Sequence, residues 1–403
     1  MDSRVIARMA GWWRQIWGMS VSRRVFAGGA AALLALGLAG GWVGASHFRP
    51  ERVAYTKSVT TPVASRPAPP APAALQGRLE KLAETYKDPV GIAVADVGAG
   101  WIAQVAGDQV FPQQSVSKLW VALAVLQAAD EGKLALDQQV VMRPEDRSVF
   151  YQPLTARIRG ANGFPITLAE LLRHALIESD NSANDKLISE LGGADTVTRT
   201  IAAKGLRGVA VGGAERDVQT RTAGLTWKPE YGRTWIFKTA RAQLPDAVRD
   251  QALAAYLANP PDGATPLGIV TALSALKRGE LLSRASTDFM LGLMAEARTG
   301  TMRMRAAVPR GWTLAHKTGT GPDWRGASVG INDVGLLTAP DGHTYAVAVM
   351  IRQTARPASA RHAIMQNVVR AVVAQWQAHA EPVPAEGRQV AAGQGASAYG
   401  RGF

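Results

Sequence analysis

Strand-like patterns occur near both ends of this chain and are separated by a long middle segment. Apolar positions alternate with a period of two in 90–95, 101–105, 311–316, 327–337 and 345–351, with turn residues at 96–100 and 340–342. This alternation is typical of half-buried strands. The middle segment, from Ser115 to about Glu296, has a mostly helical pattern. Because the strands are split in sequence, we predict that the middle of the chain is inserted between parts of one sheet.

The predicted fold class is α/β (α+β), with two lobes. One lobe is an antiparallel sheet flanked by helices at 75–86 and 360–377. The other is an inserted all-helical lobe that begins with an apolar helix from Ser115 to about Ala129. A chain of 403 residues has room for such a core of about 250 to 300 residues and for flanking segments. We place one domain at 75–380 and expect its site between the lobes.

The segments outside this domain differ from it in composition. Residues 1–45 combine Arg23 and Arg24 with an uncharged Gly/Ala/Leu run at 25–45, which resembles a twin-arginine export signal. The same run would span about 31 Å as a helix, so an uncleaved membrane anchor is the alternative. Either places the domain outside the cytoplasm, in the periplasm or at the inner membrane. Residues 46–74 form a Pro/Ala-rich linker, and 381–403 form a tail that should be disordered.

Cysteine content and charge exclude several classes of protein. The chain has no Cys and only six scattered His, which argues against disulfides, thiolate nucleophiles and metal sites. Of the net charge of +13, residues 1–57 contribute +6 through eight Lys or Arg and two acidic residues, which leaves +7 for the rest. Without a basic block, this charge indicates a basic surface rather than a nucleic-acid interface. We find no internal repeat or heptad, so we expect a monomer.

Ser115 and Lys118 form a Ser-x-x-Lys motif at the start of the apolar helix. A serine hydroxyl is a weak nucleophile and needs an adjacent base, a route for its proton and donors for the oxyanion. Residues three apart share a helix face, so the Lys118 amine can accept the serine proton if its surroundings keep it neutral. The pattern recurs at Ser274 and Lys277, but in mid-helix, and we interpret that copy as structural.

Ser179, Asp180 and Asn181 form a second motif at a predicted junction between helices. One interpretation is plain helix capping, which these residue types favour. As part of a site, Ser179 would relay a proton to the leaving nitrogen, Asn181 would donate to a substrate amide, and Asp180 would hold the loop.

Lys317, Thr318 and Gly319 form a third motif at the end of a predicted strand. Lys317 and the hydroxyls of Thr318 and Thr320 would bind a carboxylate, while Gly319 would let a substrate lie against the backbone. An ordinary edge-strand end is the alternative interpretation.

In this order, the three motifs resemble those of the penicillin-recognising serine enzymes, and class A β-lactamases most of all. The similarity covers about 75–378 and includes 111–112, 171–172, 264–282, 305–312 and 332–335. The resemblance implies an oxyanion hole formed by the backbone N–H groups of Ser115 and Thr320. It also places Tyr151 at the border of the cleft, although an ordinary surface or core tyrosine fits as well.

One element of the family pattern is altered. Class A enzymes carry a Glu, followed four residues later by Asn, and this Glu activates the water that releases the acyl group. Here Glu215 stands in a suitable place, but Gln219 follows it. Glu215 is equally well interpreted as a structural partner of Arg216 or of a neighbouring arginine. The segment 220–263 looks like an insertion that reshapes the rim of the cleft.

The resemblance implies a serine β-lactamase-type hydrolase that acts on β-lactam amides, without a cofactor or metal, and so contributes to antibiotic resistance. Its residues would be Ser115 as nucleophile, Lys118 as base, Ser179 as proton relay, Lys317 as electrostatic clamp and Glu215 as candidate deacylation base. Because that last base is poorly marked, two alternatives remain. They are a D-alanyl-D-alanine peptidase acting on peptidoglycan stem peptides, and a penicillin-binding sensor.

Overall fold

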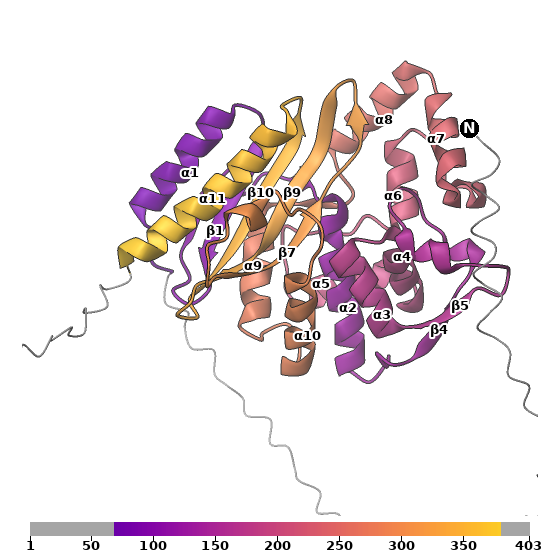
Figure 1. Cartoon of the computed structure of the whole chain (residues 1–403), viewed down its shortest axis with the longest axis horizontal. Helices are drawn as coiled ribbons and strands as arrows, with labels where there is room; N and C mark the ends of the chain where they lie inside the picture. Colours follow the sequence, from indigo (N-terminus) through magenta and orange to yellow (C-terminus); the bar gives the residue numbers. More distant parts are fainter. Residues whose placement is uncertain (1–67, 380–403) are drawn as a thin grey trace, which may run out of the picture. The chain divides into compact units, whose positions relative to one another are not determined.

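The computed structural model describes residues 68–379, which form two lobes (Figure 1). One lobe contains the main sheet, and the other is the inserted, mostly helical lobe. The strand order is β2-β1-β10-β9-β7, with β8 paired to β9. All of these pairings are antiparallel. The strands are β1 (Val90–Asp96), β2 (Ile102–Val105), β7 (Thr313–Gly319), β8 (Asp323–Trp324), β9 (Ala327–Thr338) and β10 (Thr344–Thr354). The predicted split of the sheet between the start and the end of the domain is confirmed.

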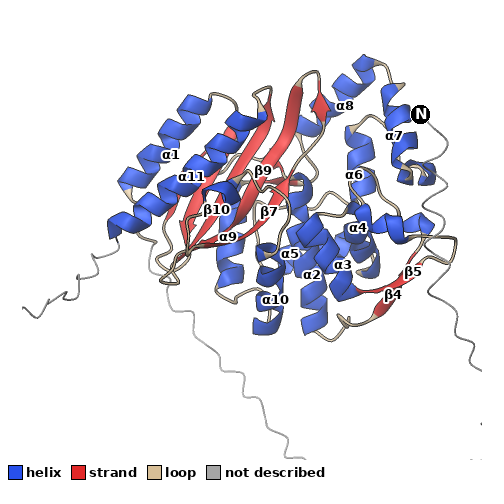
Figure 2. Cartoon of the chain, viewed as in Figure 1, coloured by secondary structure: helices blue, strands red, loops and turns tan. Residues whose placement is uncertain are grey.

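Alternate residues of the sheet face two separate cores. In β1, Ile92 and Val94 pack into the core covered by α1 and α11, whereas Ala93 and Ala95 face the core that contains α2 and α9. Figure 2 shows α1 and α11 side by side on one face of the sheet. The helices are α1 (Ala73–Tyr86), α2 (Lys118–Asp130), α3 (Leu168–Arg173), α4 (Asn181–Glu190), α5 (Ala194–Ala203), α6 (Glu215–Thr222), α7 (Thr234–Ala242), α8 (Asp246–Ala258), α9 (Pro266–Lys277), α10 (Arg284–Ala295) and α11 (Ala358–His379).

The inserted lobe is built around α2, which is buried without a break over 118–126. A helix that is apolar on all sides is typical of the centre of a lobe. The lobe is not all-helical as predicted, because β4 (Gln139–Met142) pairs with β5 (Phe164–Thr167). A second pair joins β3 (Phe111–Pro112) to β6 (Gly263–Ala264). These strands have four or two residues, too few to produce a clear alternation in the sequence.

The segment 220–263 is folded and packs against the cleft. Phe237 of α7 meets Phe150 edge-on, with ring centroids 5.0 Å apart. On α8, Leu253 and Tyr256 are buried against Val218 of α6. This segment therefore packs behind Phe150, a residue that lines the cavity described below.

The ends of the domain differ slightly from the prediction. Helix α1 begins at Ala73, so residues 73–74 belong to the helix rather than to the predicted linker. The predicted signal or anchor at 1–45, most of the linker and the tail at 381–403 lie outside the described residues. Across 68–379, every helix is too short or too polar to cross a bilayer.

Candidate active site

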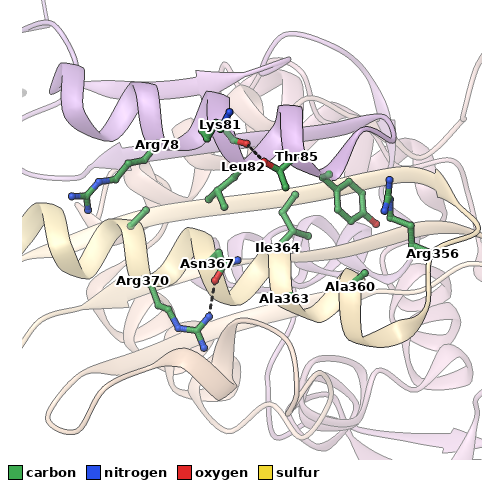
Figure 3. Close-up of a pocket in the computed structure, with 12 residues that line it drawn as sticks. Arg78, Lys81, Leu82, Thr85, Arg356, Ala360, Ala363, Ile364, Asn367 and Arg370 are labelled. Atoms are coloured by element: carbon green, nitrogen blue, oxygen red, sulfur yellow. Dashed lines mark hydrogen bonds between the residues drawn. The ribbon is translucent and has the colours of Figure 1, made fainter.

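The three motifs meet in one cavity of about 360 Å³. It is lined by Ser115, Phe150, Tyr151, Glu178, Ser179, Asn181, Gln219, Thr299, Gly300, Arg303, Thr318, Thr320, Gly321 and Pro322. A larger pocket of about 550 Å³ lies between α1 and α11, where Arg78, Leu82 and Ile364 belong to its lining (Figure 3). Because the predicted nucleophile opens into the smaller cavity, that cavity is the candidate active site.

Ser115 lies in a single 3₁₀ turn, Gln114–Ser117, directly before α2. Lys118, the first residue of α2, is fully buried, and its Nζ lies 2.9 Å from Ser115 Oγ. The same amine donates to Asn181 Oδ1 at 2.9 Å and forms a buried ion pair with Glu215. One ammonium group therefore links the serine to a carboxylate.

Glu215 is the first residue of α6, and both of its carboxylate oxygens have partners. Oε1 faces Lys118, and Oε2 accepts from Gln219 Nε2 at 3.1 Å. Burial pushes the pKa of Glu215 upward, but the Lys118 charge and the hydrogen bonds outweigh it and lower the pKa. Arg216, the alternative partner, instead donates to the Glu145 carbonyl at 3.2 Å. The structure thus brings Glu215 to the Ser115–Lys118 pair.

Asp185 of α4 holds the start of α6. Its carboxylate accepts from the backbone N–H of Glu215 at 2.6 Å and of Arg216 at 3.1 Å, which satisfies donors that a helix N-terminus leaves unpaired. It also accepts from Ser148 Oγ at 2.7 Å. Burial, followed by the charge of Glu215, raises the pKa of Asp185 to about 6. Sequence reasoning missed Asp185, since no local pattern links it to a residue 30 positions away.

Ser179 follows a π-helical turn, and its own φ is 65°, in a region that serine seldom adopts. Next to it, Asp180 accepts from the backbone N–H of Ala183 at 2.8 Å and of Leu154 at 2.7 Å. Asp180 therefore caps α4 and also ties down the loop, so both interpretations of this motif describe part of the geometry. Asn181 Nδ2 donates to the Val149 carbonyl at 2.8 Å.

Lys317 lies behind Ser179. Its Nζ donates to Ser179 Oγ at 2.8 Å and to the Thr318 carbonyl at 2.9 Å, and the side chain is fully buried. Burial, followed by the charge of Lys118, lowers the pKa of Lys317 well below its usual range. The second motif and the third thus form another Ser–Lys pair, in which Lys317 is buried and Ser179 lines the same cavity as Ser115.

The cation that lines the cavity beside the third motif is Arg303, which sequence reasoning did not select. Its Nη2 donates to Thr320 Oγ1 at 2.6 Å and its Nη1 to the Gly319 carbonyl at 2.8 Å. Thr318 Oγ1 lies 2.7 Å from Thr299 Oγ1. Arg303 precedes β7 in a loop that carries no recognisable motif.

Of the remaining predicted residues, Tyr151 lines the same cavity, and Gly319 lies between Thr318 and Thr320, which also line it. A Cβ at Gly319 would lie 2.2 Å from the Gln113 carbonyl oxygen, so only glycine fits where β7 passes this backbone. Tyr151 lines the cavity and is 57% exposed. Within the described part of the chain, the acidic and His residues form no group of three that could hold a metal ion.

A cavity-lining serine beside a buried lysine–carboxylate pair, with a second Ser–Lys pair at the same cavity, defines a lysine-assisted serine hydrolase. The profile described as "Beta-lactamase enzyme family" matches residues 74–376, and the chain belongs to this family. The predicted resemblance is confirmed.

Two relatives from Pseudomonas aeruginosa are similar over most of the domain. The chain is 24% identical to β-lactamase VEB-1 over 294 residues, which cover 73% of this chain and 87% of that protein. It is 27% identical to the extended-spectrum β-lactamase PER-1 over 297 residues, which cover 73% of this chain and 85% of that protein.

Solved structures show the same architecture. A β-lactamase from Chitinophaga pinensis superposes with a TM-score of 0.60 at 26% identity, covering 75% of this chain and 98% of that one. An ancestral class A β-lactamase gives 0.58 at 28% identity, covering 75% and 99%. The predicted two-lobed fold is therefore confirmed.

Proposed function

We propose that this protein is a serine β-lactamase that hydrolyses β-lactam amides through an acyl-enzyme on Ser115. The observation that carries the proposal is the position of Glu215, because Lys118 contacts both this carboxylate and Ser115 Oγ. A serine and a lysine suffice to form an acyl-enzyme, whereas its hydrolysis also needs a base for water. The family and the β-lactamases similar to this chain support the substrate class.

Acylation would begin with a proton transfer inside the buried ion pair. Lys118 cannot accept a proton as an ammonium ion, so Glu215 first takes one across their contact. The neutral amine then takes the proton of Ser115, whose oxygen attacks the lactam carbonyl carbon. The backbone N–H groups of Ser115 and Thr320 would stabilise the oxyanion.

Cleavage of the C–N bond requires a proton on the leaving nitrogen. Ser179 would donate it, and Lys317, at 2.8 Å from Ser179 Oγ, is placed to replace it. A lysine whose pKa is lowered by burial exchanges protons more readily near neutral pH.

Arg303, Thr318 and Thr320 would bind the carboxylate that a β-lactam carries next to its ring nitrogen. All three line the cavity, and a guanidinium suits a carboxylate in geometry and charge. Lys317 would act as the predicted clamp from behind this wall, through its charge rather than by contact. Tyr151 would border the entrance, and Asn181 would face the substrate amide.

Deacylation would use Glu215 as the base for water. The carboxylate removes a proton from water, the hydroxide attacks the ester carbon, and the proton returns to Ser115 Oγ as the C–O bond breaks. Gln219 stands where the family has Asn, and it donates to Glu215 at 3.1 Å. The altered residue therefore supplies the carboxylate with a hydrogen-bond donor.

We extend the proposal to the location of the enzyme. The signal-like residues 1–45 would carry it to the periplasm, or hold it at the inner membrane through 25–45 if they are not cleaved. The linker at 46–74 would separate the domain from the membrane. There a monomeric β-lactamase would protect the cell by destroying the drug.

The test is turnover of a chromogenic cephalosporin by the purified full-length chain. The wild type should turn over, and Glu215→Gln should slow deacylation by about a thousandfold. Without the carboxylate, burial favours the neutral amine of Lys118, which can still accept the Ser115 proton, so mass spectrometry should find a lasting adduct on Ser115. Asp217→Asn also replaces a carboxylate by an amide in the same helical turn, and it should leave turnover intact. A wild-type adduct that never hydrolyses would contradict the proposal and favour a peptidase or sensor.

A further inference from the structure

A chain of hydrogen bonds runs from the inserted segment to the proposed deacylation base. Asp262 accepts from the Tyr256 hydroxyl, at 2.9 and 3.1 Å from its two oxygens. The Tyr256 oxygen accepts from Gln114 Nε2, and Gln114 Oε1 accepts from Gln219 Nε2 at 3.0 Å. Gln219 Nε2 is also 3.1 Å from Glu215 Oε2. Residues far apart in sequence thus form one path to the carboxylate.

All members of this path are shielded from solvent. The exposed fractions are 4% for Asp262, 5% for Tyr256, 2% for Gln114, 7% for Gln219 and 5% for Glu215. A buried polar group that loses its partner cannot exchange it freely for water, so each link constrains the next.

The donor and the acceptor of each hydrogen bond in the path follow from the bond between Tyr256 and Asp262. Burial, followed by the charge of Asp262, raises the pKa of Tyr256 well above its usual range, so the phenol keeps its proton. Because this proton points to Asp262, the phenol oxygen accepts from the amide nitrogen of Gln114. The carbonyl of Gln114 then faces Gln219, which must donate.

The backbone of Gln114 is held by the same segment. Its N–H donates to Asp262 Oδ2 at 2.7 Å, and its φ is 52°, a strained value for a residue other than glycine. A Cβ at Gly330 would lie 2.7 Å from Gln114 Cγ, so the glycine makes room for this side chain. The residue before the nucleophile is thus fixed in both main chain and side chain.

We propose that Tyr256 is a positioning residue which, through Gln114 and Gln219, holds the Glu215 carboxylate in the orientation that activates water. This inference rests on the proposed function and gives the inserted helix α8 a role in it. Lys118 fixes Oε1 and Gln219 fixes Oε2. Acylation uses the Lys118 side, which Tyr256 does not touch. Loss of the phenol therefore acts on deacylation.

The pH profile offers a readout that a merely structural role would leave unchanged. The charged groups facing Glu215 are Lys118 of α2, Lys317 of β7, Asp185 of α4 and Asp262 after α8. Tyr256→Phe leaves all four residues in place, and it removes from Asp262 a hydrogen bond that lowers the pKa of that carboxyl. When the path is broken at Tyr256, Gln219 no longer holds its hydrogen bond to Glu215. This hydrogen bond helps to lower the pKa of Glu215, so its loss raises the pKa of that carboxyl. Since the base works only when ionised, the acid limb of deacylation should move to higher pH.

The experiment uses the full-length chain, a chromogenic cephalosporin and rapid-quench mass spectrometry to separate the two steps. Tyr256→Phe should slow deacylation about tenfold, the effect of one hydrogen bond expressed as a rate. At a pH above the acid limb, where Glu215 is ionised, acylation should stay within about twofold of the wild type. Tyr231→Phe, the same change at a buried tyrosine of the inserted segment that packs on Phe237, should leave both steps unchanged.

A second background tests the path itself. In Gln219→Leu, where the link to Glu215 is already broken, Tyr256→Phe should slow deacylation no further. Deacylation at the wild-type rate in Tyr256→Phe, or an equal slowing of both steps without a shift of the acid limb, would overturn the inference alone. A wild-type chain that acylates but never deacylates would overturn the proposed function and the inference with it.

Discussion

The pattern Ser-x-x-Lys occurs twice in this chain, and the two copies form different structures. At the first copy, Lys118 is fully buried with its Nζ 2.9 Å from Ser115 Oγ. At the second, in α9, the Ser274 hydroxyl is buried without a hydrogen-bond partner among residues 68–379, and Lys277 is exposed. The spacing in sequence is the same in both, so spacing alone does not create a reactive pair.

The difference lies in what surrounds each lysine. Glu215 and Asn181 enclose Lys118 and satisfy its ammonium group, and Glu215 is 97 residues away in sequence. Lys277 ends α9, where its side chain extends into water. Removing an ammonium group from water is costly unless partners replace it. A Ser-x-x-Lys motif can form a reactive pair only where the fold supplies those partners for the lysine.

The largest contrast is expected between two alanine variants. Ser115→Ala removes the proposed nucleophile and should lower cephalosporin hydrolysis by about ten-thousandfold or more. It should also abolish labelling by a fluorescent penicillin. Ser274→Ala should keep both signals. Labelling that survives in Ser115→Ala and disappears in Ser274→Ala would reverse the assignment of the two copies.

The lysines should differ in stability as well as activity. Lys118→Met leaves Glu215 as a buried carboxylate without its main partner and should lower the free energy of unfolding by about 3 to 5 kcal/mol. Lys277→Met should change it little.

The pH dependence of this loss has a defined sign. In the wild type, Lys118 helps to lower the pKa of Glu215, which stabilises the fold above the unfolded pKa. In Lys118→Met burial prevails and raises that pKa, so ionisation then destabilises the fold. The loss relative to the wild type should therefore grow with pH, as measured by urea unfolding. A loss that shrinks with pH would contradict the role of the ion pair.

The smallest effect concerns the second copy alone. Ser274→Ala should raise the free energy of unfolding by about 1 kcal/mol, because it removes a buried hydroxyl without a partner and favours the helix. Ser286→Ala is the matched control, since Ser286 Oγ donates to Asp130 at 2.6 Å and its loss should destabilise. A loss of stability in both variants would show that the Ser274 hydroxyl has a partner after all.

The sequence by itself determined the elements that depend on local periodicity. The split strands, the helices that cover the sheet and the order of the three motifs all follow from spacings of a few residues. Glu215 was also within reach, since it stands 36 residues after Ser179, but its neighbour Gln219 obscured the pattern. The short pairs β3–β6 and β4–β5 were missed because so few residues carry no clear period.

Only the tertiary structure decided which side chains support the site. Asp185 reaches the start of α6 across 30 residues, and Tyr256 reaches Gln114 across 142. Arg303 faces the cavity beside Thr320 from a loop without a motif, while Lys317 is buried behind Ser179. Such contacts depend on how distant segments pack and on which buried charges find partners. Neither the packing nor the pairing produces a periodic pattern in the sequence.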